Sequence, residues 1–288
     1  MDITFYGVRG RIASPGPETA GVGGNTSCVE VLCGGERIIL DAGTGLRKLG
    51  DKMLAEGQLE ATMLLSHQHW DHIQGIPFFV PAYIPATKLK VYGGVNGVMS
   101  LKETLAHQMT APVFPVRLDE LGAQIDLCEV RSGGAFMVGG AQVRAIKVNH
   151  PGGCFAYRID FEGRSVVYAT DTEHYACVDP ALRALAAGAD VLIYDSQYTP
   201  EEYRGDSGRS KVGWGHSTYV AGAELARSAG VGQYILFHHD PSRSDAKVAE
   251  IEAKAQALFA SSHAAREGMR VSLRSAGRDL SQPLAMAA

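Results

Sequence analysis

The stretch LLSHQHWDHIQG, Leu64–Gly75, concentrates metal-binding side chains directly after a hydrophobic segment. It contains three of the ten histidines of the chain, together with one aspartate. Residues 61–66 (ATMLLS) have the pattern of a buried strand, so the histidines are predicted to lie in the loop at its carboxyl end. A histidine-rich surface loop without function is the alternative, and the rest of the chain bears on the choice.

The spacing within this stretch suits metal ligation. His67 and His69 are two residues apart, so in an extended chain their side chains point to the same side and can bind one ion. Asp71 and His72 follow as the chain turns, and they can reach a second ion. Imidazole and carboxylate ligands without thiolates suit zinc, which is the expected metal, with manganese or iron as alternatives.

Three further potential ligands follow apolar strand patterns. His150 comes after residues 141–148, and Asp171 and His238 end or follow the strands before them. Repeated placement at strand ends is what a site at one sheet edge requires. The prediction is therefore two divalent metal ions per chain, each with an open position for a shared water. The first ion is assigned to His67, His69 and His150, the second to Asp71, His72 and His238, with Asp171 as the bridge.

Strand and helix patterns alternate along the whole chain and predict an α/β fold. The expected helices are residues 44–57, 98–109, 180–188, 217–230 and 244–267. The expected strands are 2–8, 28–33, 37–43, 61–66, 88–94, 123–130, 141–148, 154–161, 164–171, 189–196, 233–239 and 270–276. The prediction is one domain over residues 1–280, with two stacked sheets and helices outside them, and a mobile tail over residues 281–288.

Composition narrows the function classes. The formal net charge is −4, so binding to nucleic acid through broad phosphate neutralisation is not indicated, although a local basic patch is allowed. The five cysteines are scattered and form no C-x-x-C pair, which favours a reducing compartment and argues against a structural zinc-thiolate site. The sequence shows no secretory signal pattern and no apolar run of membrane-spanning length, so the expected location is cytoplasmic.

The order of the candidate ligands resembles the metallo-β-lactamase superfamily over nearly the whole chain. The resemblance implies a four-layer αββα sandwich. It also implies that Asp41, in the sequence LDAG, supports the metal loop rather than binding metal. An aspartate at position 171 makes the chain unlike true β-lactamases, and His69 makes it unlike the diiron flavoproteins, which carry glutamate there.

A second motif resembles the phosphodiesterase branch of this superfamily, which includes ribonuclease Z. His216, Ser217 and Thr218 open a predicted helix and match its H-S-T loop, so they are the predicted substrate-binding residues. Ser217 is expected to cap the helix, whose N-terminus favours a phosphate. His216 is the predicted catalytic residue beside Asp71, since it can contact a phosphoryl oxygen or protonate the leaving oxygen. A helix cap beside a solvated histidine is the alternative.

Ribonuclease Z itself fits less well, because its RNA-gripping arm is inserted where this chain has a single hairpin between His150 and Asp171. Residues 7–31 look closer to bacterial and phage phosphodiesterases that open cyclic nucleotides, a group that includes the anti-Pycsar enzymes. The phosphonate-pathway cyclic-phosphate hydrolases are another neighbour, but their cysteine-rich metal site is not found here. The family resemblance also favours a homodimer.

The expected function is a dinuclear metal-dependent phosphodiesterase. It is predicted to hydrolyse small cyclic phosphodiesters, 3′,5′-cyclic nucleotides above all, to linear monophosphates by attack of a metal-held hydroxide. The expected partner is this small substrate, with no stable nucleic-acid complex and no membrane. The alternatives are an RNA 3′-end endonuclease, a lactonase or thioesterase of the same fold, and a metal-bound sensor without turnover.

Several residues are left with open roles. Asn25 and Asp195 are expected to make supporting hydrogen bonds, and His239 to support His238. His174 is a candidate for the pocket lining, whereas His107 and His263 fall in predicted helices. The apolar segment 76–85 (IPFFVPAYIP) is open to three interpretations: a pocket wall, a dimer surface or ordinary core.

Overall fold

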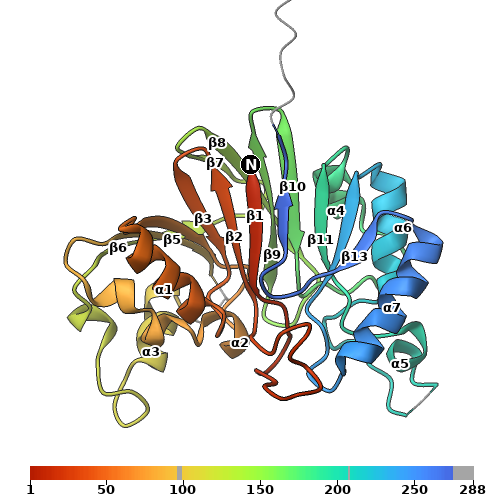
Figure 1. Ribbon diagram of the computed structural model, residues 1–288, viewed down its shortest axis with the longest axis horizontal. Helices are drawn as coiled ribbons and strands as arrows, with labels where there is room; N and C mark the ends of the chain where they lie inside the picture. Colours follow the sequence, from red (N-terminus) through yellow and green to blue (C-terminus); the bar gives the residue numbers. More distant parts are fainter. Residues whose placement is uncertain (96–98, 207, 275–288) are drawn as a thin grey trace, which may run out of the picture.

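The computed structural model describes residues 1–95, 99–206 and 208–274. Two seven-stranded sheets pack face to face, and helices cover their outer faces (Figure 1). This arrangement confirms the predicted four-layer αββα sandwich. The predicted domain end at residue 280 and the tail over residues 281–288 lie outside the described residues. Within the described ranges, none of the helices combines the length and apolar character needed to cross a membrane.

The first sheet is built from the N-terminal part of the chain and the last strand. Its order is β14-β1-β2-β3-β4-β5-β6, and the four strands from β3 to β6 run parallel. The parallel strands therefore place their carboxyl ends at one edge of the sheet. The strands are β1 Asp2–Gly7, β2 Cys28–Cys33, β3 Glu36–Leu40, β4 Glu60–Leu64, β5 Lys88–Gly94, β6 Gln124–Val130 and β14 Arg270–Ser272.

The second sheet has the order β13-β12-β11-β10-β9-β8-β7, with the strands from β10 to β13 parallel. Strand β8 runs antiparallel to β9, which runs antiparallel to β10, so β8 and β10 point the same way. The strands are β7 Ala135–Val138, β8 Ala141–Val148, β9 Cys154–Phe161, β10 Arg164–Ala169, β11 Val191–Asp195, β12 Gln233–Phe237 and β13 Ser262–Ala264.

Helices pack on both outer faces of the sandwich (Figure 1). They are α1 Leu46–Glu56, α2 Trp70–Ile73, α3 Leu101–Gln108, α4 Pro180–Ala186, α5 Pro200–Arg204, α6 Tyr219–Ala229 and α7 Asp245–Leu258. Within the described residues, short 3-10 helices span Ile76–Phe78, Val80–Tyr83 and Leu118–Glu120. The side chains of α1 and α3 join one outer core, and those of α4, α6 and α7 join the other.

The strand patterns reflect this layering. Strand β11 is buried along its whole length because the opposite sheet covers one face and helices cover the other. Strand β8 instead alternates buried and exposed residues over much of its length. The core between the sheets includes Phe5, Leu40, Tyr157 and Phe237, each of which is fully buried.

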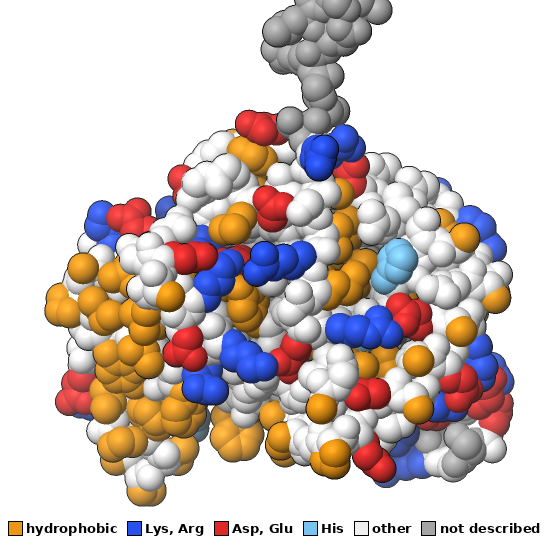
Figure 2. Space-filling model, in the orientation of Figure 1, with side chains coloured by type: hydrophobic (Ala, Val, Ile, Leu, Met, Phe, Trp, Pro, Cys, Tyr) orange, Lys and Arg blue, Asp and Glu red, His pale blue; other side chains and the backbone are white. Residues whose placement is uncertain are grey.

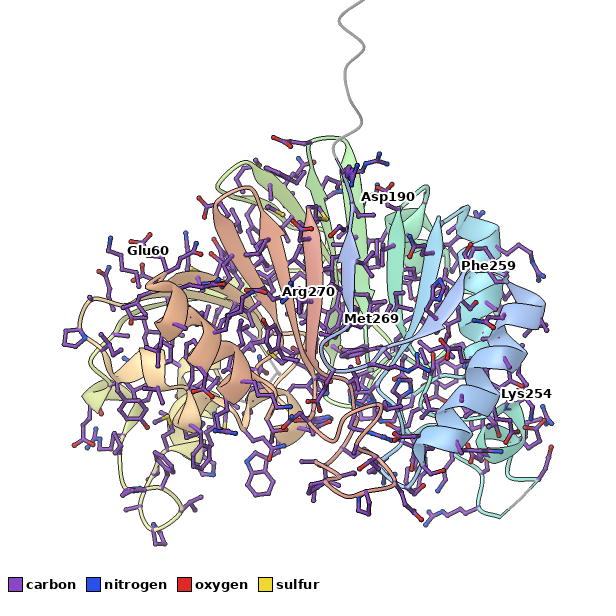
Figure 3. The ribbon with its side chains drawn as sticks, viewed as in Figure 1. Glu60, Asp190, Lys254, Phe259, Met269 and Arg270 are labelled. Atoms are coloured by element: carbon purple, nitrogen blue, oxygen red, sulfur yellow. The ribbon has the colours of Figure 1, made fainter. Side chains whose placement is uncertain are left out.

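The predicted helix over residues 244–267 is wrong after Leu258. Helix α7 ends at Leu258, and Phe259, labelled in Figure 3, follows as its C-cap. The hydroxyl of Ser262 donates a hydrogen bond to the Phe259 carbonyl, and the chain then enters β13. His263 therefore lies in a strand that pairs with β12. The alanine-rich sequence suited a helix, but edge pairing of the sheet prevailed over local propensity.

Smaller differences concern turns and helix ends. The predicted helix over 217–230 begins only at Tyr219, because Thr218 is its N-cap and accepts a hydrogen bond from the Ala221 N–H. Strand β7 lies in a segment that was not predicted as a strand, between two glycine turns. Residue 98, the first of the predicted helix 98–109, lies outside the described ranges, and α3 begins at Leu101.

Candidate dinuclear metal site

All seven predicted ligands lie at one edge of the sandwich, where strand ends from both sheets meet. The loop after β4 carries the histidine cluster, and residues after β8, β10 and β12 supply His150, Asp171 and His238. Asp171 and His238 have positive φ angles of 48° and 60°, as does Asp41 after β3 at 59°. Such backbone conformations are unfavourable for residues other than glycine, and they often mark functional sites.

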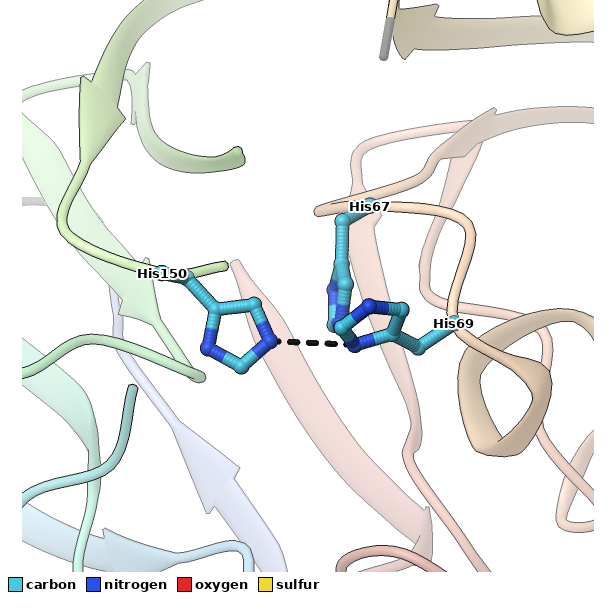
Figure 4. Close-up of side chains that lie close together, drawn as sticks. All are labelled: His67, His69 and His150. Atoms are coloured by element: carbon cyan, nitrogen blue, oxygen red, sulfur yellow. Dashed lines mark hydrogen bonds between the residues drawn. The ribbon is translucent and has the colours of Figure 1, made fainter. Parts of the chain in front are cut away.

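The first ligand cluster consists of His67, His69 and His150 (Figure 4). The Nε2 atom of His150 lies 3.0 Å from Nδ1 of His69. The ring of His67 lies 4.4 Å from that of His69 and 4.7 Å from that of His150, measured between centroids. The structure thus brings together three imidazoles that the sequence analysis grouped, and their assignment to a first ion stays a prediction.

The second cluster consists of Asp71, His72 and His238. Oδ2 of Asp71 lies 3.2 Å from Nε2 of His72 and 3.4 Å from Nε2 of His238. The two imidazole Nε2 atoms are themselves 3.3 Å apart. A mixed set of nitrogen and carboxylate donors therefore lies together, and its assignment to a second ion stays a prediction.

Asp171 lies between the two clusters and directs one oxygen toward each. Its Oδ1 lies 3.1 Å from Nε2 of His238 and 3.3 Å from Nε2 of His72. Its Oδ2 lies 3.7 Å from Nε2 of His67 and 3.8 Å from Nε2 of His150. This division of the two carboxylate oxygens is the geometry that a bridging ligand requires.

Asp41 organises the metal loop from below, in agreement with the role that the resemblance implied. One of its oxygens accepts the Ser66 N–H at 2.7 Å. The other accepts the hydroxyls of Ser66 at 2.8 Å and Tyr168 at 2.7 Å, and lies 2.7 Å from Nδ1 of His72. Because Nδ1 of His72 is held in this way, its Nε2 is left to face the site.

Two backbone groups orient further ligands. The Gly215 carbonyl lies 2.8 Å from Nδ1 of His150, and the Arg11 N–H donates to Oδ2 of Asp71 at 2.6 Å. These contacts tie the loop after β1 and the loop before α6 to the ligands. Both loops therefore border the site, although they lie about two hundred positions apart in the sequence.

Burial controls the protonation of the first cluster. It is the largest cause that lowers the pKa of His67, His69 and His150. Asp171 opposes this effect in each case without reversing it. These imidazoles are therefore neutral near pH 7, and a neutral nitrogen is the form that binds a metal ion.

The residues present fit divalent cations. Nε2 of His67 is buried without a hydrogen-bond partner in the described part of the chain, although it faces the other two histidines of its cluster. A buried polar atom without a partner is costly, and a metal ion at this point would satisfy it. Burial raises the pKa of Asp171, but the nearby His238, His72 and His67 have a larger effect in the opposite direction. The pKa therefore lies well below its usual value, and the carboxylate stays ionised.

His216 lies beside both clusters and is oriented by a carboxylate. Its Nδ1 atom lies 2.8 Å from Oδ2 of Asp195, and its ring stacks on that of His238 with centroids 5.1 Å apart. Burial lowers the pKa of His216, but Asp195 and the two site carboxylates raise it more, so the net shift is upward. A carboxylate that orients a protonated histidine is an arrangement suited to proton donation. The supporting hydrogen bond expected for Asp195 is confirmed.

The expected cap role of Ser217 is wrong, because Thr218 caps α6. The hydroxyl of Ser217 lies 3.0 Å from the hydroxyl of Tyr194 and 3.0 Å from Nδ1 of His174. The hydroxyls of Ser217 and Thr218 are thus both engaged within the protein, so the geometry favours supporting roles for them. Their predicted contacts with substrate stay predictions.

The sequence analysis overlooked Glu173. This buried side chain accepts hydrogen bonds from the N–H groups of Gly213 and Gly215, at 2.7 and 2.8 Å, and from the hydroxyl of Tyr203 at 2.7 Å. It therefore fixes the loop that delivers His216. The one sequence feature that could have identified Glu173 is its position two residues after the ligand Asp171.

Replacing Glu173 with Gln should loosen this loop, because an amide offers one acceptor oxygen where the carboxylate offers two. We expect a loss of about 1–3 kcal/mol in unfolding free energy and a roughly tenfold fall in turnover with metals retained. Thermal unfolding, metal analysis and initial rates measure the three effects. Glu224→Gln, at an exposed position of α6, is the matched control, and identical behaviour of the two variants would contradict the role.

The remaining candidates have ordinary roles. His239 is buried, and its Nε2 lies 3.0 Å from the Ala265 carbonyl, so it supports the strand end rather than the metal cluster. Asn25 makes the expected supporting contacts, since its side-chain amide donates to Glu267. Segment 76–85 is partly core, since Phe79 is fully buried, and partly surface, since Phe78 is 60% exposed. Figure 2 shows apolar side chains gathered over the side that carries α1 and α3.

Known proteins match both the sequence and the fold. The family model described as "Beta-lactamase superfamily domain" matches residues 36–239. A ribonuclease Z from Mycobacterium sp. (strain KMS) is 26% identical over 281 residues, covering 90% of this chain and 91% of the relative. The metallo-beta-lactamase fold protein YhfI from Bacillus subtilis has a TM-score of 0.70 at 20% identity, covering 94% of this chain and 98% of that one. A diphosphatase from the PhnP family has a TM-score of 0.69 at 18% identity, covering 95% and 98%.

The fold and the ligand clusters define a metal-dependent hydrolase of the metallo-β-lactamase type. The matched family covers most of the chain and includes all the ligands found here, from His67 to His238. The chain belongs to the beta-lactamase superfamily domain family. The predicted family and the predicted enzyme class are therefore both confirmed.

Proposed function

We propose that the chain is a dinuclear phosphodiesterase that converts small cyclic phosphodiesters, 3′,5′-cyclic nucleotides above all, to linear monophosphates. The observation that carries the proposal is the His216–Asp195 pair, held beside two ligand clusters that share Asp171. The assignment to hydrolases of phosphoric diesters is further supported by the relative named ribonuclease Z that covers 90% of this chain.

Two divalent ions, zinc in the first place and manganese as the alternative, are proposed for the two clusters. When bound, such ions polarise phosphoryl oxygens and lower the pKa of a bound water. One ion would be held by His67, His69 and His150. The other ion would be held by Asp71, His72 and His238, and Asp171 would bind both ions.

The chain's own side chains would move the protons. Asp195 holds Nδ1 of His216, and Nε2 of His216 makes no hydrogen bond in the described part of the chain. That nitrogen can therefore donate its proton to the leaving ribose oxygen as the bond between phosphorus and oxygen breaks. Asp71 is proposed to assist by holding the second ion. Burial raises the pKa of its carboxyl group, but His72 and His238 lower it more, so the group stays ionised as a ligand.

A small substrate is favoured over RNA by two properties of the chain. The hairpin of β9 and β10 is the main structure between His150 and Asp171, where the RNA-gripping arm of ribonuclease Z is inserted. The net charge of −4 gives no broad attraction for a polyanion. The rival function, an RNA 3′-end endonuclease, is favoured by the name of the curated relatives.

The proposed substrate class can be tested with the metal-loaded protein and ³¹P NMR. We expect 3′,5′-cyclic pyrimidine and purine mononucleotides to give linear monophosphates, since the chemistry is centred on the phosphate. KM should change little with salt, whereas binding of a long RNA would weaken steeply. Cleavage of precursor transfer RNA with every cyclic nucleotide left intact would establish the rival function. Opening of lactones or thioesters alone would exclude phosphodiester hydrolysis.

The expected homodimer is part of the same proposal. Phe78 and Val80 from segment 76–85 are exposed, as is Val113, and Phe78 packs edge-on against Phe114. Exposed apolar groups of this kind are common at protein interfaces, so this surface supports association with a second copy.

A further inference from the structure

Three cationic side chains surround one indole ring at the border of the metal site. Nζ of Lys211 lies 4.1 Å from the ring centroid of Trp214. The guanidinium carbons of Arg11 and Arg209 lie 5.7 and 5.8 Å from the same centroid. The three cations repel one another, so their gathering at one ring is unfavourable unless an anion compensates them. It also contrasts with the net charge of −4 of the whole chain.

The cluster is connected to the ligands through short backbone links. The N–H of Arg11 donates to Asp71, and the residue after Trp214 supplies the carbonyl that contacts His150. Glu173 binds the N–H groups on both sides of Trp214, which fixes the backbone of this segment two residues before His216. The cations are therefore held at the border of the site rather than on a remote surface.

The cations have little compensation from the protein. Among the described residues, the one carboxylate within 4.0 Å of these three side chains is Asp240, at 3.7 Å from Arg11. Asp240 also accepts hydrogen bonds from the backbone and hydroxyl of Ser242. The positive potential of Arg209 and Lys211 is thus available to an anion that arrives from solvent.

A buried donor lies beside His216, two residues after Trp214. The Tyr198 hydroxyl is buried without a hydrogen-bond partner among the described residues, and so is the side-chain amide of Gln197. The Tyr198 ring centroid also lies 5.8 Å from that of His216. An acceptor arriving beside His216 would satisfy this hydroxyl.

We propose that Arg11, Arg209, Lys211 and Tyr198 form a subsite for a second phosphate group of a nucleotide substrate. The proposal rests on the proposed function, since it takes the first phosphate to lie at the metal clusters. An anion is favoured over a stacked base because the indole is already engaged by cations. The second phosphate can be the other diester of a cyclic dinucleotide or a phosphate monoester on a mononucleotide, and both present the same anionic oxygens.

The subsite can be tested through competition in a reporter assay. Bis(4-nitrophenyl) phosphate carries one phosphate and reports turnover of the metal-loaded protein whether or not cyclic nucleotides are substrates. We expect thymidine 3′,5′-bisphosphate to inhibit at roughly tenfold lower concentration than thymidine 5′-monophosphate, because charge-assisted contacts hold the additional phosphate. A cyclic dinucleotide, compared with a cyclic mononucleotide, provides the second arm and identifies which source of the phosphate is preferred.

The double variant Arg209→Gln/Lys211→Gln should abolish this preference while reporter kcat and metal content stay unchanged. Arg227→Gln, at an exposed position of α6, is the control and should retain the preference. An equal preference in wild type and double variant, or none in wild type, would overturn the subsite. Failure of cyclic nucleotides to react would overturn the proposed function instead. The inhibition measured with bis(4-nitrophenyl) phosphate would still test the subsite in that case.

Discussion

Asp171→Ala should lose at least one of the two metal ions and more than about a hundredfold in phosphodiester turnover. Its two oxygens are divided between the clusters, with Oδ1 3.1 Å from His238 and Oδ2 3.7 Å from His67, so one substitution affects both. Changes to groups that merely support metal ligands commonly cost 10–100-fold, and loss of a shared ligand should exceed that. Elemental analysis of dialysed protein and initial rates on bis(4-nitrophenyl) phosphate measure the two effects.

The control for this substitution is Asp126→Ala, at an exposed position of β6. It should retain both ions and full activity. Full metal content in Asp171→Ala would contradict the bridging role. A variant that loses its fold would be detected by circular dichroism, and Asp171→Asn, which keeps the side-chain volume, then provides the comparison, with the same loss of metal expected.

His216→Ala should keep both ions and the fold but lower turnover by roughly 10²–10⁴-fold, the usual effect of removing a general acid or base. Its ring is held by Asp195 and is not one of the proposed ligands, so metal content should not change. The loss should be smaller for a nitrophenyl ester than for a cyclic nucleotide, because nitrophenolate leaves without a proton. Paired rate measurements on the two substrates provide the test.

The ratio of the two losses distinguishes the possible roles of His216. Equal losses on both substrates would make it a phosphate contact rather than a proton donor. Unchanged rates on both substrates would show that His216 has no catalytic role. The H-S-T motif would then only begin a helix. Asp195→Asn should reproduce part of the loss on the cyclic nucleotide, since the carboxylate orients the ring.

The ligands were predictable from the sequence because each follows an apolar strand. The carboxyl ends of β4, β8, β10 and β12 meet at one edge, so strand-end positions become spatial neighbours. The residues that support the ligands or border the site could not be predicted, because their roles depend on contacts that no local sequence pattern encodes. Glu173 acts through backbone N–H groups of a distant loop, and Arg11 meets Trp214 across about two hundred positions.

Helix boundaries show the same limit. The alanine-rich run after Leu258 has helical propensity, yet it supplies the edge strand β13 because β12 offers unpaired backbone groups there. Ser217 and Thr218 are both suitable caps by residue type. The choice of Thr218 follows from the contacts of Ser217 with Tyr194 and His174, which become visible only in the folded chain.

The most direct test of the dinuclear site is anomalous X-ray diffraction from crystals of the metal-loaded protein. We predict two peaks per chain about 3.5–4 Å apart, as in other two-metal hydrolases. One peak should lie among His67, His69 and His150, and the other among Asp71, His72 and His238, with Asp171 in contact with both. A single peak in fully loaded protein, or a pair of peaks that Asp171 does not join, would contradict the account.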